Sequence, residues 1–285
     1  MSLYVYPQLS NRDYGFVRVG GPGLANCLFV AARAALLARH LNGQAVLLRP
    51  TWERFGIGQF LRREKDKRFY VGLFRDESAM SKLKKAAIIR VNPRIPEEKA
   101  LEAKSGVIVV SGLRNYFADL WEGVDYVRDF VLSSIEPSAI AQVPQEMRKS
   151  VAIHVRLGDF PQKYRTELCW YESMIEKVSA RFAPHTVDFQ LFSDGTDAEL
   201  APLLRHQGVR RVYYGNALAD IIAISRCGFL IGSDSTFSGW GAFLGDVPSV
   251  FAHLEWKQLF EDRHRYAVLD WKADIPVCIL NKITK

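Results

Sequence analysis

The 285-residue sequence predicts an α/β protein built from two Rossmann-like halves. Short apolar stretches alternate along the chain with longer amphipathic stretches, which is the order that parallel sheets covered by helices require. A segment bounded by Pro137 and Pro144 interrupts this alternation, and the alternation restarts cleanly at Val151. We therefore expect an N-terminal α/β domain over residues 1–145 and a C-terminal Rossmann-like domain over residues 146–285.

In the N-terminal half, a glycine-rich turn separates the first predicted strand from a long helix, and two more strands and a second helix follow. The expected elements are a strand at 16–19, a helix at 24–41, strands at 45–49 and 107–111, and a helix at 116–135. Between the second and third strands lies a charged stretch, Thr51–Lys104, with weak periodicity.

The C-terminal half has the more regular pattern. We expect strands at 151–155, 187–192, 209–214, 228–231 and 248–252, and helices at 170–182, 197–206, 218–226 and from about Thr236. The remainder of the chain is expected to form a tail.

Composition favours a globular protein with an anionic partner. Hydrophobic residues make up 48% of the chain and charged residues 24%, and the formal net charge is +7. A nucleotide, a nucleic acid or an acidic membrane surface would suit this charge. No zinc-finger or RNA-binding pattern is present, so a nucleic acid is not expected. The basic runs at 62–68 and 82–85 alternate with acidic and apolar residues, and we interpret them as solvated helix faces, with membrane attachment as the second interpretation.

No targeting or membrane-spanning segment is expected. No apolar run reaches the roughly 18 residues that a transmembrane helix needs, and Met1–Asn11 lacks the basic flank and apolar core of a secretory signal. The expected location is the cytoplasm, with peripheral association at the inner membrane face as an extension of it.

The four cysteines predict no metal site. Cys27, Cys169, Cys227 and Cys278 are far apart and show neither zinc-binding nor redox spacing. We expect them to be reduced and mostly buried.

The segment Val151-Ala-Ile-His-Val-Arg-Leu-Gly-Asp159 is typical of a buried strand that ends in polar groups. Ligands of open α/β sheets bind at this end of the strands, and the planar fork of Arg156 suits a phosphate. The alternative is a structural ion pair between Arg156 and Asp159.

Two further strands end in polar residues. In Leu191-Phe-Ser-Asp-Gly195, Ser193 or Asp194 could cap the next helix, or the carboxylate could accept hydrogen bonds from a guanine edge or a ribose. After the strand at 228–231, five hydroxyl or carboxyl side chains occur within seven residues: Ser233, Asp234, Ser235, Thr236 and Ser238. One helix cap does not need five such residues, so this cluster predicts an anion site at a helix start.

The turn Gly20-Gly-Pro-Gly-Leu-Ala-Asn26 lies between the first predicted strand and its helix. Its spacing is neither a dinucleotide fingerprint nor a P-loop, and a plain tight turn explains it equally well. By contrast, the predicted strands at 151–155, 187–192 and 228–231 end at one edge of one sheet, so Arg156, Asp194 and Ser235 are expected to converge. A guanidinium, a carboxylate and a hydroxyl-rich helix start match a nucleoside diphosphate.

Taken together, these segments resemble the inverting α-1,2-fucosyltransferases of glycosyltransferase family 11. The family motif His-x-Arg-Arg-x-Asp is matched by His154-Val-Arg-Leu-Gly-Asp159, in which Leu157 replaces the second arginine. Phe192-Ser-Asp194 and the block 220–244 match two further motifs. The family's amino-terminal glycine turn is matched in altered form by 20–27, and Ser111–Phe117 resembles its middle segment.

The resemblance implies a GT-B fold, in which two Rossmann-like domains face a cleft, with the acceptor on the N-terminal side and GDP-fucose bound by the C-terminal domain. It implies inversion at the fucose carbon, no metal and no cofactor. Arg156 would hold the β-phosphate, and Asp159 is the motif's own carboxylate. The other implied donor-binding residues are His154, Asp194, Ser233, Ser235, Thr236 and Ser238. The implied acceptor or cleft residues are Gly21, Gly23, Asn26, Asn115 and Tyr116.

Several alternatives stay open at this point. Leu157 leaves room for another GDP- or dTDP-deoxysugar as donor, and it also leaves room for a non-catalytic nucleotide-binding protein. A nucleotide-sugar hydrolase or a sulfotransferase could use the same crevice, although the turn at 20–26 lacks the lysine of a sulfotransferase phosphate loop. The catalytic base, the acceptor, the linkage and the oligomeric state are not predicted by the sequence. Asp13 and Asn26 are expected to lie near the presumed cleft.

Overall fold

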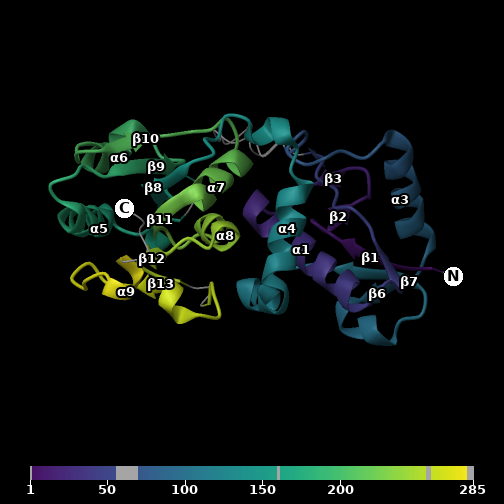
Figure 1. Cartoon of the computed structure of the whole chain (residues 1–285). Helices are drawn as coiled ribbons and strands as arrows, with labels where there is room; N and C mark the ends of the chain where they lie inside the picture. Colours follow the sequence, from purple (N-terminus) through teal and green to yellow (C-terminus); the bar gives the residue numbers. More distant parts are fainter. Residues whose placement is uncertain (1, 56–69, 159–160, 255–257, 281–285) are drawn as a thin grey trace. The chain divides into compact units, whose positions relative to one another are not determined.

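The computed structural model describes residues 2–55, 70–158, 161–254 and 258–280, with only the backbone of Arg263. The chain divides into two compact units, Met1–Ala139 and Ile140–Lys285. The short 3₁₀ helix η3 (Pro137–Ile140) spans the division, which falls a few residues before the boundary expected from the sequence. Each unit contains its own parallel sheet (Figure 1).

The first unit is built on a four-stranded sheet in the order β4-β1-β7-β6. The strands are β1 (Leu3–Pro7), β4 (Ala45–Leu47), β6 (Arg94–Pro96) and β7 (Gly106–Val110). All neighbouring pairs are parallel. Strand β1 is central, and Val5 and Tyr6 are completely buried in it. The sequence pattern did not predict β1.

The prediction of a strand at 16–19 in the main sheet is wrong. Only β3 (Arg18–Val19) forms there, in a small separate sheet with β2 (Arg12–Asp13) and β5 (Arg54–Phe55). Because β1 already occupies the centre of the main sheet, the chain from Gln8 to Gly23 is used as a long connection that returns to the helix α1.

Helix α1 (Leu24–His40) begins where the sequence predicts, and twelve of its residues are buried. The helix expected at 116–135 is two elements, the 3₁₀ helix η2 (Tyr116–Gly123) and the α-helix α4 (Val124–Ser134). Helix α3 (Ala79–Val91) and the 3₁₀ helix η1 (Glu97–Glu102) lie within the charged stretch. Lysines 82–85 lie on α3, but Lys85 is only 3% exposed, so the interpretation of this run as a solvated face is wrong at that residue.

The second unit is a six-stranded parallel sheet in the order β10-β9-β8-β11-β12-β13. The strands are β8 (Met147–Val155), β9 (Asp188–Ser193), β10 (Val209–Arg211), β11 (Cys227–Gly232), β12 (Ser249–Phe251) and β13 (Tyr266–Val268). The segment expected as a tail thus adds an edge strand. It also contains the 3₁₀ helix η5 (Arg263–Arg265) and the helix α9 (Val277–Leu280).

Helices cover both faces of this sheet, as the alternation in the sequence predicts. Alternate β8 residues Val151, Ile153 and Val155 pack with α5 (Leu168–Phe182) and α6 (Asp197–Leu204) in one core. Residues between them, such as His154, contact α8 (Thr236–Gly245) on the other face. Helix α7 (Ala217–Arg226) packs against α8 at Gly241, where an added Cβ would lie 2.4 Å from the Ile224 side chain. The 3₁₀ helix η4 (Gln162–Tyr164) precedes α5.

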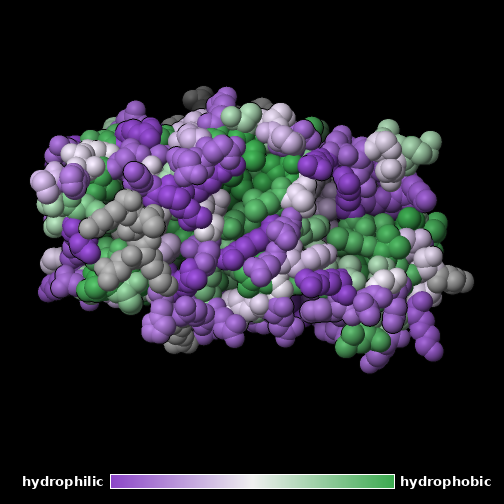
Figure 2. Space-filling view, viewed as in Figure 1, coloured by the Kyte–Doolittle hydropathy of each residue, from purple (hydrophilic) through white to green (hydrophobic). Residues whose placement is uncertain are grey.

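This topology places the ends of three neighbouring strands together. Strand β8 lies between β9 and β11, all three run in the same direction, and their carboxyl ends meet at one edge of the sheet. Figure 2 shows hydrophilic residues over most of the visible face, with smaller hydrophobic areas between them. Within the described ranges, no helix is long and apolar enough to cross a membrane.

Candidate functional site

The centre of the site is an ion pair between the ends of β8 and β9. Arg156 directly follows β8, and its Nη1 donates to Oδ2 of Asp194, which directly follows β9. The second oxygen, Oδ1, accepts the backbone N–H of Leu157 at 2.8 Å. One carboxylate therefore holds both the guanidinium and the chain that carries it. The two side chains are 31% and 27% exposed, so the pair stays open to solvent at the sheet edge.

Gly158 allows the two strand ends to approach each other this closely. A Cβ added at Gly158 would lie 2.4 Å from Oδ2 of Asp194. Any side chain at this position would therefore push the carboxylate away from Arg156. The close approach of Asp194 therefore explains why this position of the motif is a glycine.

Leu157 belongs to the interior and not to the polar edge. Its side chain is 7% exposed and joins the core cluster of β8 and α5. It also lies against Gly195, where an added Cβ would be 2.6 Å from the leucine Cδ1. Its contribution to the site is the backbone N–H that Asp194 accepts.

Behind the edge, a buried network ties β8 to β11 and α8. The Nδ1 of His154 lies 2.5 Å from Ser238 Oγ and 2.9 Å from Ser233 Oγ, and the two hydroxyls are 3.2 Å apart. Ser233 also donates its backbone N–H to the His154 carbonyl at 3.0 Å. The ring of Phe237 stacks on the imidazole at 4.8 Å.

Burial lowers the pKa of His154 to about 3, so the imidazole is neutral at neutral pH. His154 is 6% exposed, Ser233 is 4% exposed and Ser238 is fully buried. These residues fix the start of α8 relative to β8. Direct contact between them and a nucleotide stays a prediction.

The start of α8 forms the second polar group at the edge. Ser235 is the N-cap of the helix, and its Oγ accepts the Phe237 N–H at 3.3 Å. The first turn contains no acidic residue, so the positive end of the helix dipole is not offset there. Ser235 and Thr236 are partly exposed. Together with Arg156 on the neighbouring strand, this arrangement can bind an anion such as a phosphate.

Arg211, which the sequence analysis missed, holds the loop that carries Asp194. It is the last residue of β10 and donates to the carbonyls of Ser193 at 3.2 Å and Gly195 at 2.7 Å. It also pairs with Asp197 in the first turn of α6. In the sequence it lies in the middle of the strand predicted at 209–214, and the observed strand ends at Arg211 itself.

The glycine turn of the first unit lies at the start of α1. Gly21 has φ of +94°, and Gly23 is the N-cap without a side-chain cap. The Gly20 carbonyl accepts from Arg18 at 2.8 Å and from Arg54 at 3.0 Å. Arg18 is fully buried, and its Nη2 has no hydrogen-bond partner among the described residues. Asn26 is partly buried in the first turn of α1.

Asp13, which the sequence placed near the cleft, is buried and engaged. It accepts the Tyr6 hydroxyl at 2.5 Å, the Gly15 N–H at 3.1 Å and the Leu9 N–H at 3.2 Å. With 4% exposure, it shapes the connection between β1 and β3.

Asn115 and Tyr116 lie in the loop that follows β7. Asn115 is exposed, and its backbone and side-chain nitrogens donate to Asp119. Tyr116 has φ of +54° and packs edge-on against Phe29 at 5.6 Å. The nearly buried Arg33 donates to the Gly112 carbonyl at 2.6 Å and therefore anchors the start of this loop.

The predicted residues thus fall into two groups, one in each unit. Arg156, Asp194 and the start of α8 gather at one edge of the second sheet, and the glycine turn and the Asn115 loop belong to the first unit. Asp159 lies outside the described residues, so its role stays a prediction. The cysteines are free: Cys27 and Cys227 are buried, whereas Cys169 and Cys278 are exposed. In the described part of the chain, no group of three or more metal-binding side chains forms.

Comparisons with known proteins agree with this architecture. The model of the family "Glycosyl transferase family 11" matches residues 105–259, which is more than half of the chain. No relative was found among curated proteins.

Among solved structures, the fucosyltransferase NodZ from Bradyrhizobium aligns with a TM-score of 0.50 and 14% identity, over 87% of this chain and 94% of that chain. An Arabidopsis thaliana FUT1 mutant in complex with GDP aligns with a TM-score of 0.50 and 11% identity, over 93% of this chain and 73% of that chain. The fold is therefore the GT-B type of these enzymes, with two units that each contain a parallel sheet. The family match establishes that the chain is a glycosyltransferase and belongs to glycosyl transferase family 11.

Proposed function

We propose that the protein transfers fucose from GDP-fucose to a hydroxyl of a glycan, with inversion at the fucose carbon, an α-1,2 linkage and no metal ion. The observation that carries the proposal is the ion pair of Arg156 and Asp194 beside the start of α8, at the carboxyl edge of the second sheet. A structural neighbour of the same fold was solved with GDP, and the motifs that resemble the fucosyltransferases lie at this edge.

Arg156 is the proposed electrostatic catalyst. When the bond between fucose and the diphosphate breaks, negative charge develops on the departing GDP, and a positioned guanidinium stabilises it. Asp194 uses both of its oxygens to hold Arg156 and Leu157. We therefore assign it mainly an orienting role, with its remaining lone pairs available to the nucleoside.

The start of α8 is the proposed second phosphate contact. Ser235 and Thr236 would supply hydroxyl donors, and the helix dipole would add to the charge of Arg156. The buried network of His154, Ser233 and Ser238 would hold this helix start in place, because it links α8 to the strand that carries Arg156.

Inversion requires a group that takes the proton from the acceptor hydroxyl. Asp159 is our candidate, on the basis of the motif resemblance. The glycan acceptor would bind to the first unit, and the net charge of +7 would suit an acceptor at the anionic inner face of a membrane.

Another donor is the second candidate. The resembled motif has an arginine where this chain has Leu157, and Leu157 is buried in the core. A guanidinium that other members present is therefore replaced by an apolar contact, and another GDP- or dTDP-deoxysugar is the alternative donor.

Thermal stabilisation by nucleotides tests the donor. GDP and GDP-fucose should raise the melting temperature more than UDP, dTDP and GDP-mannose, because a ligand that binds the folded state stabilises it. The shift should not change when EDTA is added. A preference for dTDP would support the second candidate, and the absence of any shift would contradict the nucleotide site.

Arg156→Ala tests the phosphate role. We expect a loss of about 100-fold or more in the rate of transfer, which is the usual cost of removing one preorganised donor from a developing charge. The matched control is Arg148→Ala, because Arg148 is an exposed arginine near the other end of the same strand. An Arg156→Ala variant with full activity would exclude Arg156 from the mechanism.

A further inference from the structure

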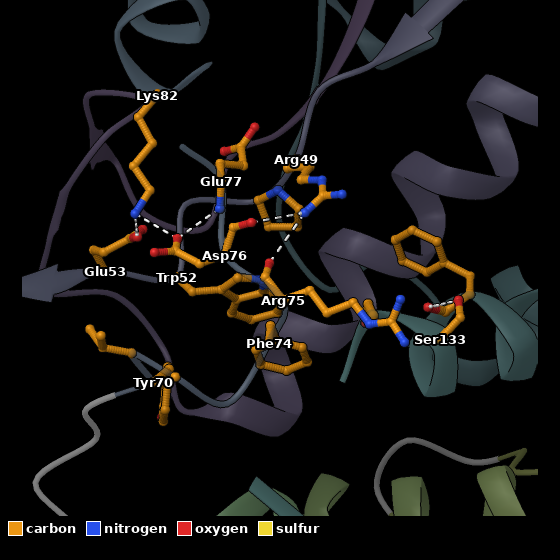
Figure 3. Close-up of a pocket in the computed structure, with 15 residues that line it drawn as sticks. Arg49, Trp52, Glu53, Tyr70, Phe74, Arg75, Asp76, Glu77, Lys82 and Ser133 are labelled. Atoms are coloured by element: carbon orange, nitrogen blue, oxygen red, sulfur yellow. Dashed lines mark hydrogen bonds and ion pairs between the residues drawn. The ribbon is translucent and has the colours of Figure 1, made fainter. Parts of the chain in front are cut away.

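The first unit contains a cavity that the proposed donor site does not use (Figure 3). Its volume is about 300 Å³, which is at the small end of the roughly 300–1,000 Å³ range of ligand pockets. Its walls come from the chain that follows β4, the chain that precedes α3, and helix α4. Its lining includes Arg49, Trp52, Glu53, Tyr70, Phe74, Arg75, Asp76, Glu77, Lys82 and Phe130.

The cavity lies at the carboxyl edge of the first sheet. Strand β4 ends at Leu47, and Arg49 follows two residues later. Strands β1 and β7 run parallel to β4, so the Asn115 loop leaves the same edge of the sheet. This is the edge at which open α/β sheets bind their ligands.

Aromatic rings form the apolar part of the cavity. Trp52 and Phe74 stack with ring centroids 3.9 Å apart and an angle of 12° between the rings. Phe74 is 4% exposed and Tyr70 is 2% exposed, whereas Trp52 is partly exposed. The buried ring of Phe74 holds the indole of Trp52 in place, and the indole is the more exposed of the two rings. Such a ring can pack against the carbon face of a sugar ring.

Each of the three carboxylates of the cavity pairs with a lysine. Lys82 pairs with Glu53 and with Asp76, and a hydrogen bond from Lys82 lowers the pKa of Asp76. Lys85, which is 3% exposed, pairs with Glu77 and donates to the Arg49 carbonyl at 3.1 Å. The two lysines offset two of the three negative charges of the cavity wall.

The two arginines of the cavity are not neutralised in this way. Nη1 of Arg49 donates to the backbone carbonyls of Arg75 and Asp76, at 3.2 and 3.5 Å. Within the described ranges, no carboxylate pairs with Arg49 or Arg75. Figure 3 shows the Arg75 side chain extended toward Ser133 of α4. Lys85 does not line the cavity but pairs with Glu77, which does. With Lys85 counted, two lysines and two arginines stand against three carboxylates, and one positive charge is unmatched.

We propose that this cavity binds an anionic sugar residue of the acceptor glycan. The sugar ring would pack on Trp52, and its carboxylate or phosphate would bind Arg75 and Arg49. Bidentate arginine contacts are the usual means of recognising either group. The assignment of the occupant to the acceptor rests on the proposed function, whereas the binding of an anionic sugar does not.

Matched pairs of sugars test the proposal on the full chain by ligand-observed NMR. The probes are the methyl glycosides of glucose and galactose, the corresponding methyl uronides, and the two sugar 1-phosphates. In at least one series, the uronide or the phosphate should bind about tenfold more tightly than the neutral sugar, because only the anion reaches the arginines. Comparing the uronides with the sugar 1-phosphates shows whether the cavity prefers a sugar carboxylate or a sugar phosphate.

Arg75→Gln should remove this preference and leave the weak binding of the neutral sugar. Arg75 is exposed and on the surface, so the variant should fold. Arg90→Gln on the exposed side of α3 is the matched control with the same loss of charge, and it should bind like the wild type. The proposal is overturned if anionic and neutral sugars bind equally, or if no probe binds. It is also overturned if Arg75→Gln keeps the preference for anions, or if inorganic phosphate alone binds as tightly as the anionic sugars.

The donor assay separates this proposal from the proposed function. Arg75→Gln should retain the thermal shift with GDP, because its site belongs to the first unit. If GDP produces no shift in the wild type while the uronides bind, the proposed function fails and the cavity remains an anionic sugar site. If GDP binds and the sugars do not, only the cavity proposal fails.

Discussion

At the scale of single residues, His154 shows how a polar side chain can serve a site from the interior. The sequence presents it at the end of a strand, next to Arg156, as a contact to the nucleotide. In the structure it is buried, and both hydroxyls that it contacts belong to the segment around the start of α8. Its neutral imidazole therefore maintains the geometry between β8 and α8.

Acid should destabilise the second unit through His154. Its pKa is about 3 in the folded protein and 6.5 in the unfolded chain, so below pH 6.5 the unfolded state binds a proton that the folded state excludes. The free energy of unfolding should fall as the pH decreases from about 6.5 toward 3, by about 1.4 kcal/mol per pH unit. Denaturant unfolding at several pH values measures this slope.

His154→Gln provides the control for that slope. The glutamine side chain can still accept a hydrogen bond from a serine, but it takes up no proton. The slope of the free energy of unfolding against pH should therefore be smaller in the variant by about 1.4 kcal/mol per pH unit. An identical pH dependence in both proteins would contradict the assignment to His154. The overall loss of stability in the variant does not affect this comparison of slopes.

At the scale of elements, the caps of α6 and α8 can be compared, because both helices begin at the same edge of the second sheet. Thr196 caps α6 in a complete capping box with Glu199, whereas Ser235 caps α8 without an acidic residue in the first turn. The two helix starts therefore differ in electrostatics. The dipole of α6 is offset by Asp197 and Glu199, whereas the first turn of α8 has no acidic residue.

Ser235→Ala and Thr196→Ala should separate stability from binding. Each variant loses a cap and should lose about 1 kcal/mol of stability. We expect only Ser235→Ala to weaken the binding of GDP, by about tenfold, because only α8 is proposed to contact the phosphates. Calorimetry of GDP binding to both variants measures the difference, and equal affinities would remove α8 from the proposed site.

At the scale of the whole molecule, each unit has its own core. One cluster unites β8, β9, β11 and helices α5 and α6, and another unites β1, β7 and α1. A nucleotide bound at the edge of the second sheet should therefore act mainly on the second unit.

Hydrogen exchange should locate the nucleotide. GDP should slow exchange in the segments 156–158, 193–196 and 232–238, which follow β8, β9 and β11. Exchange in the core strands β1 and β7 should not change. Mass spectrometry of exchanged peptides measures both groups, and protection confined to the first unit would contradict the placement of the donor.

How much could be predicted depended on whether a feature is local. Helix α1 and the strands β8 to β12 of the second unit were predicted within a few residues, because their apolar periodicity is contained in the segments themselves. Strand β1 was missed because five residues that begin near the terminus offer little pattern. Strand β13 was missed because it becomes a strand only by pairing with β12.

The sequence by itself determined the α/β class, the family motifs and the polar residues at the strand ends. It did so because periodicity, glycine turns and helix caps are properties of neighbouring residues. Only the tertiary structure decided that His154 and Leu157 are buried, that Arg211 holds the Asp194 loop, and that Arg49 and Arg75 share one cavity. These outcomes depend on contacts between segments far apart in the chain, since the environment of a charge is set by whatever the fold packs around it.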